Sequence, residues 1–257
     1  MTQFRLRDRP LPSDGETLVT MSAPGEKAGQ DRTVGLAVPG AGTGSRMGGI
    51  RKPFLELRGK PLLAWALRPF LEHPSVTAVA IALGADDFDS PPSWLTDLDP
   101  RIRLVSGGAT RGDSVRAALE ALPETVDLVA VHDAARPLVT RAIIDRCLAA
   151  AGTRRGAVAG WPAVDTLKEV DGEGRILATP DRERIWHAQT PQVFPRGLIM
   201  EAYRNAHEGG LANTDDAALV EGIGGEVVMV QGSPWNLKVT RPEDLPLAEF
   251  FLKALEG

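Results

Sequence analysis

The segment Thr33-Val-Gly-Leu-Ala-Val-Pro-Gly-Ala-Gly-Thr-Gly-Ser-Arg-Met47 joins an apolar run to a loop rich in glycine. A short apolar run bounded by turn residues is typical of a β-strand that is buried on both faces. Glycines directly after such a strand let the backbone approach a ligand, and their N–H groups suit phosphate oxygens. Arg46 and Lys52 add full positive charge beside this loop. The segment therefore predicts a strand, a phosphate-binding loop and a nucleoside triphosphate as ligand.

Two common glycine-loop motifs do not fit this loop. The dinucleotide motif G-x-G-x-x-G would need a glycine where Ser45 or Met47 stands. The P-loop needs a lysine directly after its second glycine, but Ile50 follows Gly49. On the glycines alone, an ordinary strand-to-helix turn is an equally good interpretation.

The composition bounds the class of protein. The chain has 257 residues, of which 43% are hydrophobic and 25% charged, as in ordinary globular proteins. A net charge of -5 argues against non-specific binding of nucleic acid. Cys147 is the only cysteine, which excludes an internal disulfide and a zinc site made of cysteines. Because neither a signal peptide nor a membrane-spanning run is apparent, we expect a cytoplasmic protein without a membrane partner.

Strands and helices alternate through most of the chain. Residues 1–32 are polar and lack periodicity, which predicts a disordered tail before one domain at 33–257. Further apolar runs predict strands at 76–83, 101–105, 126–131, 156–160 and 227–230. Apolar residues at helical spacing lie near 61–71, 115–122, 141–147, 198–206, 216–220 and 241–255. This order predicts a three-layer α/β fold around a mostly parallel twisted sheet.

The ligand of such a sheet sits beyond the carboxyl ends of its strands. The glycine loop, the Gly107-Gly108 turn and Asp133 each follow a predicted strand. We therefore expect these three segments to meet in one crevice.

Two regions interrupt the alternation. Residues 84–100 read as a loop, and residues 190–195 as a lead-in to the helix near 198. Between about 162 and 187, two alternating segments flank a turn at 171–174, which predicts a β-hairpin. Its polar character on both sides indicates an arm that reaches out of the domain, toward a second subunit. Two helix starts are also expected, with Thr140 as a cap and Thr240-Arg-Pro-Glu243 as a capping box.

Several motifs, in the same order along the chain, resemble those of 2-C-methyl-D-erythritol 4-phosphate cytidylyltransferases of the non-mevalonate isoprenoid pathway. The resemblance covers about residues 33–255. Each motif alone is weak, but their common order is specific. The motifs are Gly42–Met47, Ser106–Ser114, Val131–Pro137, Asp165–Lys168, Trp186–Gln192, Thr214–Asp215 and Asn236–Asp244.

The resemblance implies a Rossmann-like nucleotidyltransferase and a reaction. The phosphate of 2-C-methyl-D-erythritol 4-phosphate would attack the α-phosphorus of CTP in line, giving 4-diphosphocytidyl-2-C-methyl-D-erythritol and pyrophosphate. Mg²⁺ or another divalent cation would assist, and a homodimer through the hairpin arm would complete the site. Ribitol 5-phosphate as acceptor, a sugar nucleotidyltransferase using another base, and a nucleotide-binding module without turnover stay open as alternatives.

The resemblance also assigns roles to residues. The expected catalytic cations are Arg46, Lys52, Arg182 and Lys238. The expected nucleotide-binding residues are Pro39, Gly40, Ala41, Gly42, Gly44, Gly107, Gly108, Arg111, Ser114 and Ala134. The expected substrate-binding residues are Asp133, Arg136, Thr166, Arg182, Thr190, Thr214, Asp215 and Lys238, with Asp133 also holding the metal.

Some of these residues have plainer interpretations. Asp133 is also the kind of residue that caps a following segment, and Arg182 could be a solvated charge. Arg51 is a rival to Lys52, because the loop before it is short for the family. Ala109 stands where the family often has an acidic residue, and Gln189 stands where it often has leucine.

Overall fold

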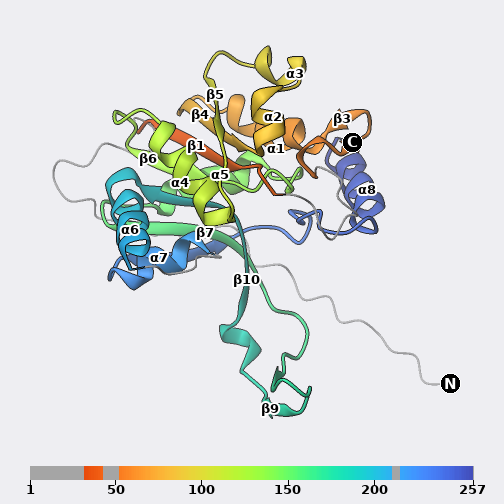
Figure 1. Ribbon diagram of the computed structural model, residues 1–257. Helices are drawn as coiled ribbons and strands as arrows, with labels where there is room; N and C mark the ends of the chain where they lie inside the picture. The colour runs from red at the N-terminus through yellow and green to blue at the C-terminus, as the bar shows by residue number, and fades with distance from the viewer. Residues whose placement is uncertain (1–31, 43–51, 210–214, 257) are drawn as a thin grey trace.

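A central seven-stranded sheet organises the protein in this computed structural model, which describes residues 32–42, 52–209 and 215–256 (Figure 1). The strand order is β11-β7-β10-β6-β1-β4-β5. Its strands are β1 (Val34–Pro39), β4 (Val76–Leu83), β5 (Ile102–Ser106), β6 (Leu128–Val131), β7 (Arg155–Pro162), β10 (Trp186–Pro195) and β11 (Glu226–Gln231).

The sheet is mostly parallel, as the alternation of strands and helices predicted. β1 pairs in parallel with β4 on one side and with β6 on the other. β10 is the exception, because it runs antiparallel to both β6 and β7. The carboxyl ends of β1, β5 and β6 therefore lie along one edge, where the crevice was expected.

Helices cover both faces of the sheet (Figure 1). Alternate residues of β1 face opposite sides: Leu36 packs into one core cluster and Ala37 into the other. The first cluster includes residues of α1 (Leu62–Leu71) and α5 (Arg141–Ala150). The second includes residues of α4 (Arg111–Ala121), α6 (Arg196–Glu208) and α7 (Asp216–Gly222). Burial on both faces explains why the central strands are continuous apolar runs.

A smaller cluster supports the carboxyl end of the chain. α8 (Asp244–Glu256) packs near the short strands β2 (Glu56–Leu57) and β3 (Lys60–Pro61). The 3₁₀ turn η2 (Lys52–Phe54) precedes these strands. Together they flank the same edge of the sheet as the crevice.

Two predictions about local structure were wrong. Residues 84–100 contain the short helices α2 (Ala85–Asp89) and α3 (Ser93–Thr96) instead of a plain loop. The lead-in at 190–195 is part of the ten-residue strand β10. Its register shifts between Ala188 and Gln192, an irregularity that accommodates Pro191, which has no N–H to donate to a neighbouring strand.

The two expected helix caps differ in detail from the prediction. Thr140 occupies the N-cap of α5, but its side chain makes no capping hydrogen bond to any residue that the structure describes. At α8 the acidic side chain that bonds to the residues before the helix is Asp244 rather than Glu243. Its Oδ2 accepts hydrogen bonds from the backbone N–H groups of Thr240 and Arg241 and from the Thr240 hydroxyl. The helix consequently begins at Asp244.

The predicted hairpin forms an arm between β7 and β10 that extends away from the sheet (Figure 1). It consists of β8 (Glu169–Val170), β9 (Ile176–Ala178) and the 3₁₀ turn η3 (Arg182–Arg184). Asp171 holds the turn, because its carboxylate accepts hydrogen bonds from the backbone of Glu173 and Arg175. That the arm joins two subunits stays a prediction.

None of the helices in the described ranges is long and apolar enough to cross a membrane. A cytoplasmic location stays a prediction. Residues 1–31 lie outside the described ranges, but Arg32 is anchored. Its guanidinium donates hydrogen bonds to the carbonyls of Leu148 (2.6 Å) and Ala151 (2.7 Å) at the end of α5.

Candidate functional site

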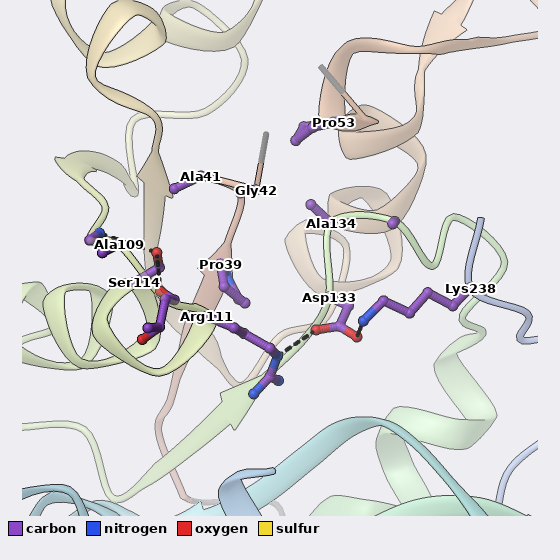
Figure 2. Close-up of a pocket in the computed structure, with 14 residues that line it drawn as sticks. Pro39, Ala41, Gly42, Pro53, Ala109, Arg111, Ser114, Asp133, Ala134 and Lys238 are labelled. Atoms are coloured by element: carbon purple, nitrogen blue, oxygen red, sulfur yellow. Dashed lines mark hydrogen bonds and ion pairs between the residues drawn. The ribbon is translucent and has the colours of Figure 1, made fainter. Parts of the chain in front are cut away.

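A pocket of about 410 Å³ lies at the carboxyl edge of the sheet, and we call it the Asp133 pocket (Figure 2). It is bounded by the loop after β1, the turn between β5 and α4, the loop after β6 and the segment before α8. These segments are far apart in sequence and meet here as predicted. The lining residues are Pro39, Gly40, Ala41, Gly42, Pro53, Gly108, Ala109, Thr110, Arg111, Ser114, Asp133, Ala134, Ala135 and Lys238.

Three cations surround the carboxylate of Asp133. Lys238 Nζ lies 2.7 Å from Oδ2, and Arg111 Nε lies 3.1 Å from Oδ1 (Figure 2). Arg136 Nε is farther away, at 3.8 Å from Oδ2. Burial alone would raise the pKa of Asp133, but Arg111 and then Lys238 outweigh it and hold this pKa well below its usual value. The carboxylate is therefore ionised at neutral pH.

Arg111 connects Asp133 to a second buried carboxylate. Its Nη1 and Nη2 donate to Oδ1 and Oδ2 of Asp216, at 3.1 and 2.8 Å. Burial on its own would lower the pKa of Arg111, but Asp216 and Asp133 together raise that pKa above its usual value. The guanidinium is thus permanently charged and held on two sides.

The loop that carries Asp133 is fixed by a buried chain of hydrogen bonds. The Asp133 N–H donates to the hydroxyl oxygen of Thr190 at 3.0 Å, and this hydroxyl contacts Nδ1 of His132 at 3.0 Å. Nε2 of His132 lies 3.1 Å from the carbonyl oxygen of Arg136. Because a carbonyl can only accept, Nε2 carries the proton and Nδ1 accepts from Thr190. Burial lowers the pKa of His132 to about 4, so the ring is neutral at pH 7.

The segment that carries Lys238 is held by Asn236, which is fully buried. Its Nδ2 donates to Oε1 of Gln189 (3.2 Å) and to the carbonyl of Thr190 (2.9 Å), both in β10. The backbone carbonyl of Asn236 accepts a hydrogen bond from Nη1 of Arg136 at 2.8 Å. Gln189, which departs from the common family residue, therefore has a structural partner of its own.

Two glycines let the turn between β5 and α4 pack closely against its neighbours beside the pocket. A Cβ on Gly107 would overlap Cβ of Ala41 and would lie 2.9 Å from Oγ of Ser114. A Cβ on Gly108 would overlap Cβ of Asp113. Side-chain atoms do not tolerate such approaches, so only glycine fits at either position without moving a neighbour. The Gly108 N–H also donates to Oγ of Ser114 at 3.2 Å.

The structure brings most of the predicted nucleotide-binding residues into this one pocket. Gly107, Arg136 and Thr190 lie directly behind its lining and contact lining residues. Asp215 precedes α7, where its Oδ1 accepts from Gln192 at 2.7 Å. Thr166 and Arg182 lie on the arm and are not among the lining residues; Arg182 donates to the carbonyl of Val164.

Several predicted residues fall outside this description. Gly44, Arg46, Arg51 and Thr214 lie outside the described residues. The backbone of Lys52 begins η2, which brings Pro53 to the pocket, but the Lys52 side chain is outside the described part of the chain. Their proposed roles stay predictions.

Sequence reasoning missed some residues of the site. The sequence assigns no role to Asp216, which pairs with Arg111, or to Tyr203, which donates to Asp216. The only available signal was that Asp216 is adjacent to the predicted residue Asp215. The pairing with Arg111 joins residues 105 positions apart, so no local pattern reveals it.

Comparisons with known proteins agree on one family. The family model described as IspD, 2-C-methyl-D-erythritol 4-phosphate cytidylyltransferase, matches residues 34–254. A protein of that name from Symbiobacterium thermophilum is 44% identical over 221 residues, which cover 86% of this chain and 93% of the relative. Another protein of that name, from Microcystis aeruginosa, is 43% identical, and the match covers 84% of this chain and 97% of the relative. The crystal structure of the enzyme of that name from Thermus thermophilus is similar with a TM-score of 0.73 and 36% identity, and the match covers 86% of this chain and 99% of that one.

Proposed function

Because the chain belongs to the 2-C-methyl-D-erythritol 4-phosphate cytidylyltransferase family, we propose that its reaction takes place in the Asp133 pocket. The protein transfers a cytidylyl group from CTP to 2-C-methyl-D-erythritol 4-phosphate, giving 4-diphosphocytidyl-2-C-methyl-D-erythritol and pyrophosphate. The observation that carries the placement is the gathering of glycine-lined backbone and three cations around one buried carboxylate.

CTP binds against the loop after β1 and the turn before α4. Among the residues that the structure describes, no atom lies within 4 Å of a Cβ added at Gly42, which leaves room for a phosphate to approach its backbone. On the other side, the turn at Gly108 meets the base. Ser114 holds this turn, because its hydroxyl accepts from the Gly108 N–H and donates to the carbonyl of Thr110. In this proposal Arg46 and Lys52 stabilise the charge that develops on the triphosphate, which is the usual role of cations in such transfers.

The phosphate of the acceptor binds on the Lys238 side of the pocket. The Lys238 side chain is 40% exposed although its ammonium contacts a buried carboxylate, so it can also meet an incoming anion. Arg136 lies behind it and adds a second positive charge. Two cations placed beside the attacking phosphate reduce its repulsion from the triphosphate.

Asp133 fits a divalent cation that arrives with CTP. Mg²⁺ is commonly held by one or two carboxylates together with substrate phosphates and water. In the described ranges, no group of three or more His, Cys, Asp or Glu side chains forms a metal cage. A single ionised carboxylate at the pocket is therefore consistent with a metal whose other ligands come from the nucleotide. When bound, the cation would neutralise charge on phosphate oxygens.

The protein contributes position and charge rather than a nucleophile. The substrate phosphate attacks the α-phosphorus of CTP in line, so no covalent enzyme intermediate is required. His132 is neutral and both of its ring nitrogens are engaged in the loop, which leaves it no part in proton transfer. The chemistry therefore depends on how accurately Asp133, Arg111 and Lys238 are held.

The arm completes the site of a second subunit in this proposal. It carries exposed apolar side chains, with 67% of Val164, 62% of Ile176 and 61% of Leu177 accessible. Exposed apolar groups gathered on one segment indicate a contact with another protein surface. A homodimer formed through the arms would bring Thr166 and Arg182 of one subunit to the Asp133 pocket of the other.

Release of pyrophosphate tests the function. The purified protein is incubated with CTP, UTP or ATP, each combined with 2-C-methyl-D-erythritol 4-phosphate or ribitol 5-phosphate. Release is expected only with CTP and 2-C-methyl-D-erythritol 4-phosphate, and Asp133→Asn is expected to abolish it. A preference for ribitol 5-phosphate, or full activity of Asp133→Asn, would overturn the proposal.

A further inference from the structure

Arg111 is the only described cation that links two buried carboxylates at this pocket. Its Nε faces Asp133, whereas both of its terminal nitrogens face Asp216. A bidentate arginine–carboxylate pair fixes the plane of the guanidinium as well as its position. The direction in which Nε–H points toward Asp133 is therefore determined by Asp216.

Asp216 has no access to substrate. It is fully buried at the start of α7 and is absent from the lining of the pocket. The hydroxyl of Tyr203, from α6, donates to its Oδ1. Tyr203 is itself buried, so its hydroxyl helps to fix the orientation of the Asp216 carboxylate. Asp216 therefore acts on the site only through Arg111.

The carboxylates of Asp133 and Asp216 have different electrostatic roles toward Arg111. Asp133 is shared among Arg111, Lys238 and Arg136, and its charge is further shared when anions and their cation bind. Asp216 stays with Arg111 throughout, because it is fully buried and does not line the pocket. Arg111 thus keeps a counter-ion while Asp133 changes partners, and a buried charge that lost its counter-ion would be costly.

We propose that Asp216, backed by Tyr203, is a positioning residue that holds Arg111 and thereby aims the Asp133 carboxylate at the reacting phosphates. The inference rests on the function proposed above for the Asp133 pocket. It assigns roles to two residues that never touch the ligands.

The first test is Asp216→Asn, which keeps the shape of the side chain and removes its charge. Turnover and the dissociation constant for CTP in the presence of Mg²⁺, the latter by isothermal titration calorimetry, are measured on protein shown to be folded by circular dichroism. Loss of an outer partner of a ligating carboxylate typically costs about 10- to 100-fold, and we expect a loss of this size in both kcat/KM and CTP affinity. The matched control is Glu221→Gln, an exposed carboxylate on the same helix, which should leave both unchanged.

The second test asks whether Asp216 acts through Asp133. CTP affinity is measured for Asp216→Asn, for Asp133→Asn and for the double variant. If Asp216 only aims Asp133, the double variant binds CTP no more weakly than Asp133→Asn alone. If Asp216→Asn instead lowers CTP affinity by the same factor in the wild type and in Asp133→Asn, Asp216 supports the fold in general. That result would overturn the proposal.

Tyr203→Phe keeps the test decisive if Asp216→Asn does not fold. This variant removes one hydroxyl and leaves the Arg111–Asp216 pair in place, so a smaller loss of the same kind is expected, again absent in the Asp133→Asn background. Wild-type turnover separates the two hypotheses. If the wild type does not release pyrophosphate, the proposed function fails; if it does and both variants match it, only the positioning role fails.

Discussion

The ammonium group of Lys238 lies 2.7 Å from Oδ2 of Asp133, yet 40% of the lysine side chain is exposed to solvent. One end of this ion pair is therefore buried and the other faces the pocket. Such a lysine is held in place before substrate arrives and is still able to contact it. Preorganised charge of this kind stabilises a transition state without reorganisation during the reaction.

Replacement of Lys238 by alanine is expected to lower kcat/KM about a hundredfold or more, because it removes a cation that we propose contacts the reacting phosphates. Pyrophosphate release under saturating CTP gives the rate, and thermal unfolding shows whether the variant is folded. Lys253→Ala is the matched control, since Lys253 is exposed on α8 and away from the pocket lining. Undiminished turnover of folded Lys238→Ala would contradict the role assigned to Lys238.

Gly107→Ala is expected to weaken CTP binding more than it weakens folding. The added Cβ would overlap Cβ of Ala41, so the loop after β1 has to move away. Overpacking of this kind costs about 1–3 kcal/mol, which corresponds to at least about a fivefold change in affinity if the cost falls on the bound state. Isothermal titration calorimetry measures the affinity. Gly197→Ala serves as control, because no atom of the described residues lies within 4 Å of its added Cβ. Equal CTP affinity of the wild type and both variants would count against this prediction.

Arg182→Ala and Lys238→Ala are expected to complement each other when the two variants are co-expressed. If Arg182 reaches the pocket of the partner, a mixed dimer has one site with both residues intact. Each variant alone should be nearly inactive, and the purified mixed dimer should recover part of the wild-type rate. If Arg182 instead acted within its own subunit, neither site of the mixed dimer would be complete and no activity would return.

If the protein forms the proposed homodimer through its arms, charges on the arm are expected to dissociate that dimer. Ile176→Asp combined with Leu177→Asp places carboxylates where exposed apolar side chains now stand, and burying them in a contact would be unfavourable. Analytical ultracentrifugation should show a monomer with unchanged circular dichroism. Phe250→Asp, at an exposed apolar position of α8, is the control and should remain a dimer. A monomer from Phe250→Asp but not from the arm variant would place the interface on α8.

The stability of the β5 side of the sheet should depend on pH through Asp99. Hydrogen bonds from Arg101 lower the pKa of Asp99 from 3.8 to about 2, and Arg101 also donates to the carbonyls of Leu71 and Val76. A lowered pKa stabilises the folded state above the unfolded value near 4, and this contribution is lost as the pH falls through about 2.

Asp99→Asn should therefore lower the free energy of unfolding at pH 7 by about 1.5–3 kcal/mol, the range for a hydrogen bond to a charged group. Urea unfolding between pH 7 and pH 2.5 measures the gap between variant and wild type, which should narrow below pH 4. Asp89→Asn, at an exposed carboxylate on α2, provides the comparison. A gap that stays constant over this range would contradict the assignment.

The parts of the fold that sequence predicted well are those with a local cause. β1 and β4 are buried on both faces, so their composition alone marks them as strands. β10 escaped prediction because Gln189, Pro191 and Gln192 break any apolar periodicity, and its pairing with β6 and β7 is a tertiary property. The same holds for Asp216, whose role depends on a partner in another helix.

A single continuous strand joins the arm to the buried side of the Asp133 pocket. β10 leaves the arm at Trp186 and supplies Gln189 and Thr190 to the network that secures the loops of Asp133 and Lys238. Inserting one residue between these points would turn every later side chain of the strand to its opposite face. The length of that short span is therefore constrained from both ends, and we expect a change of length to be accommodated at the tip of the arm rather than between Trp186 and Thr190.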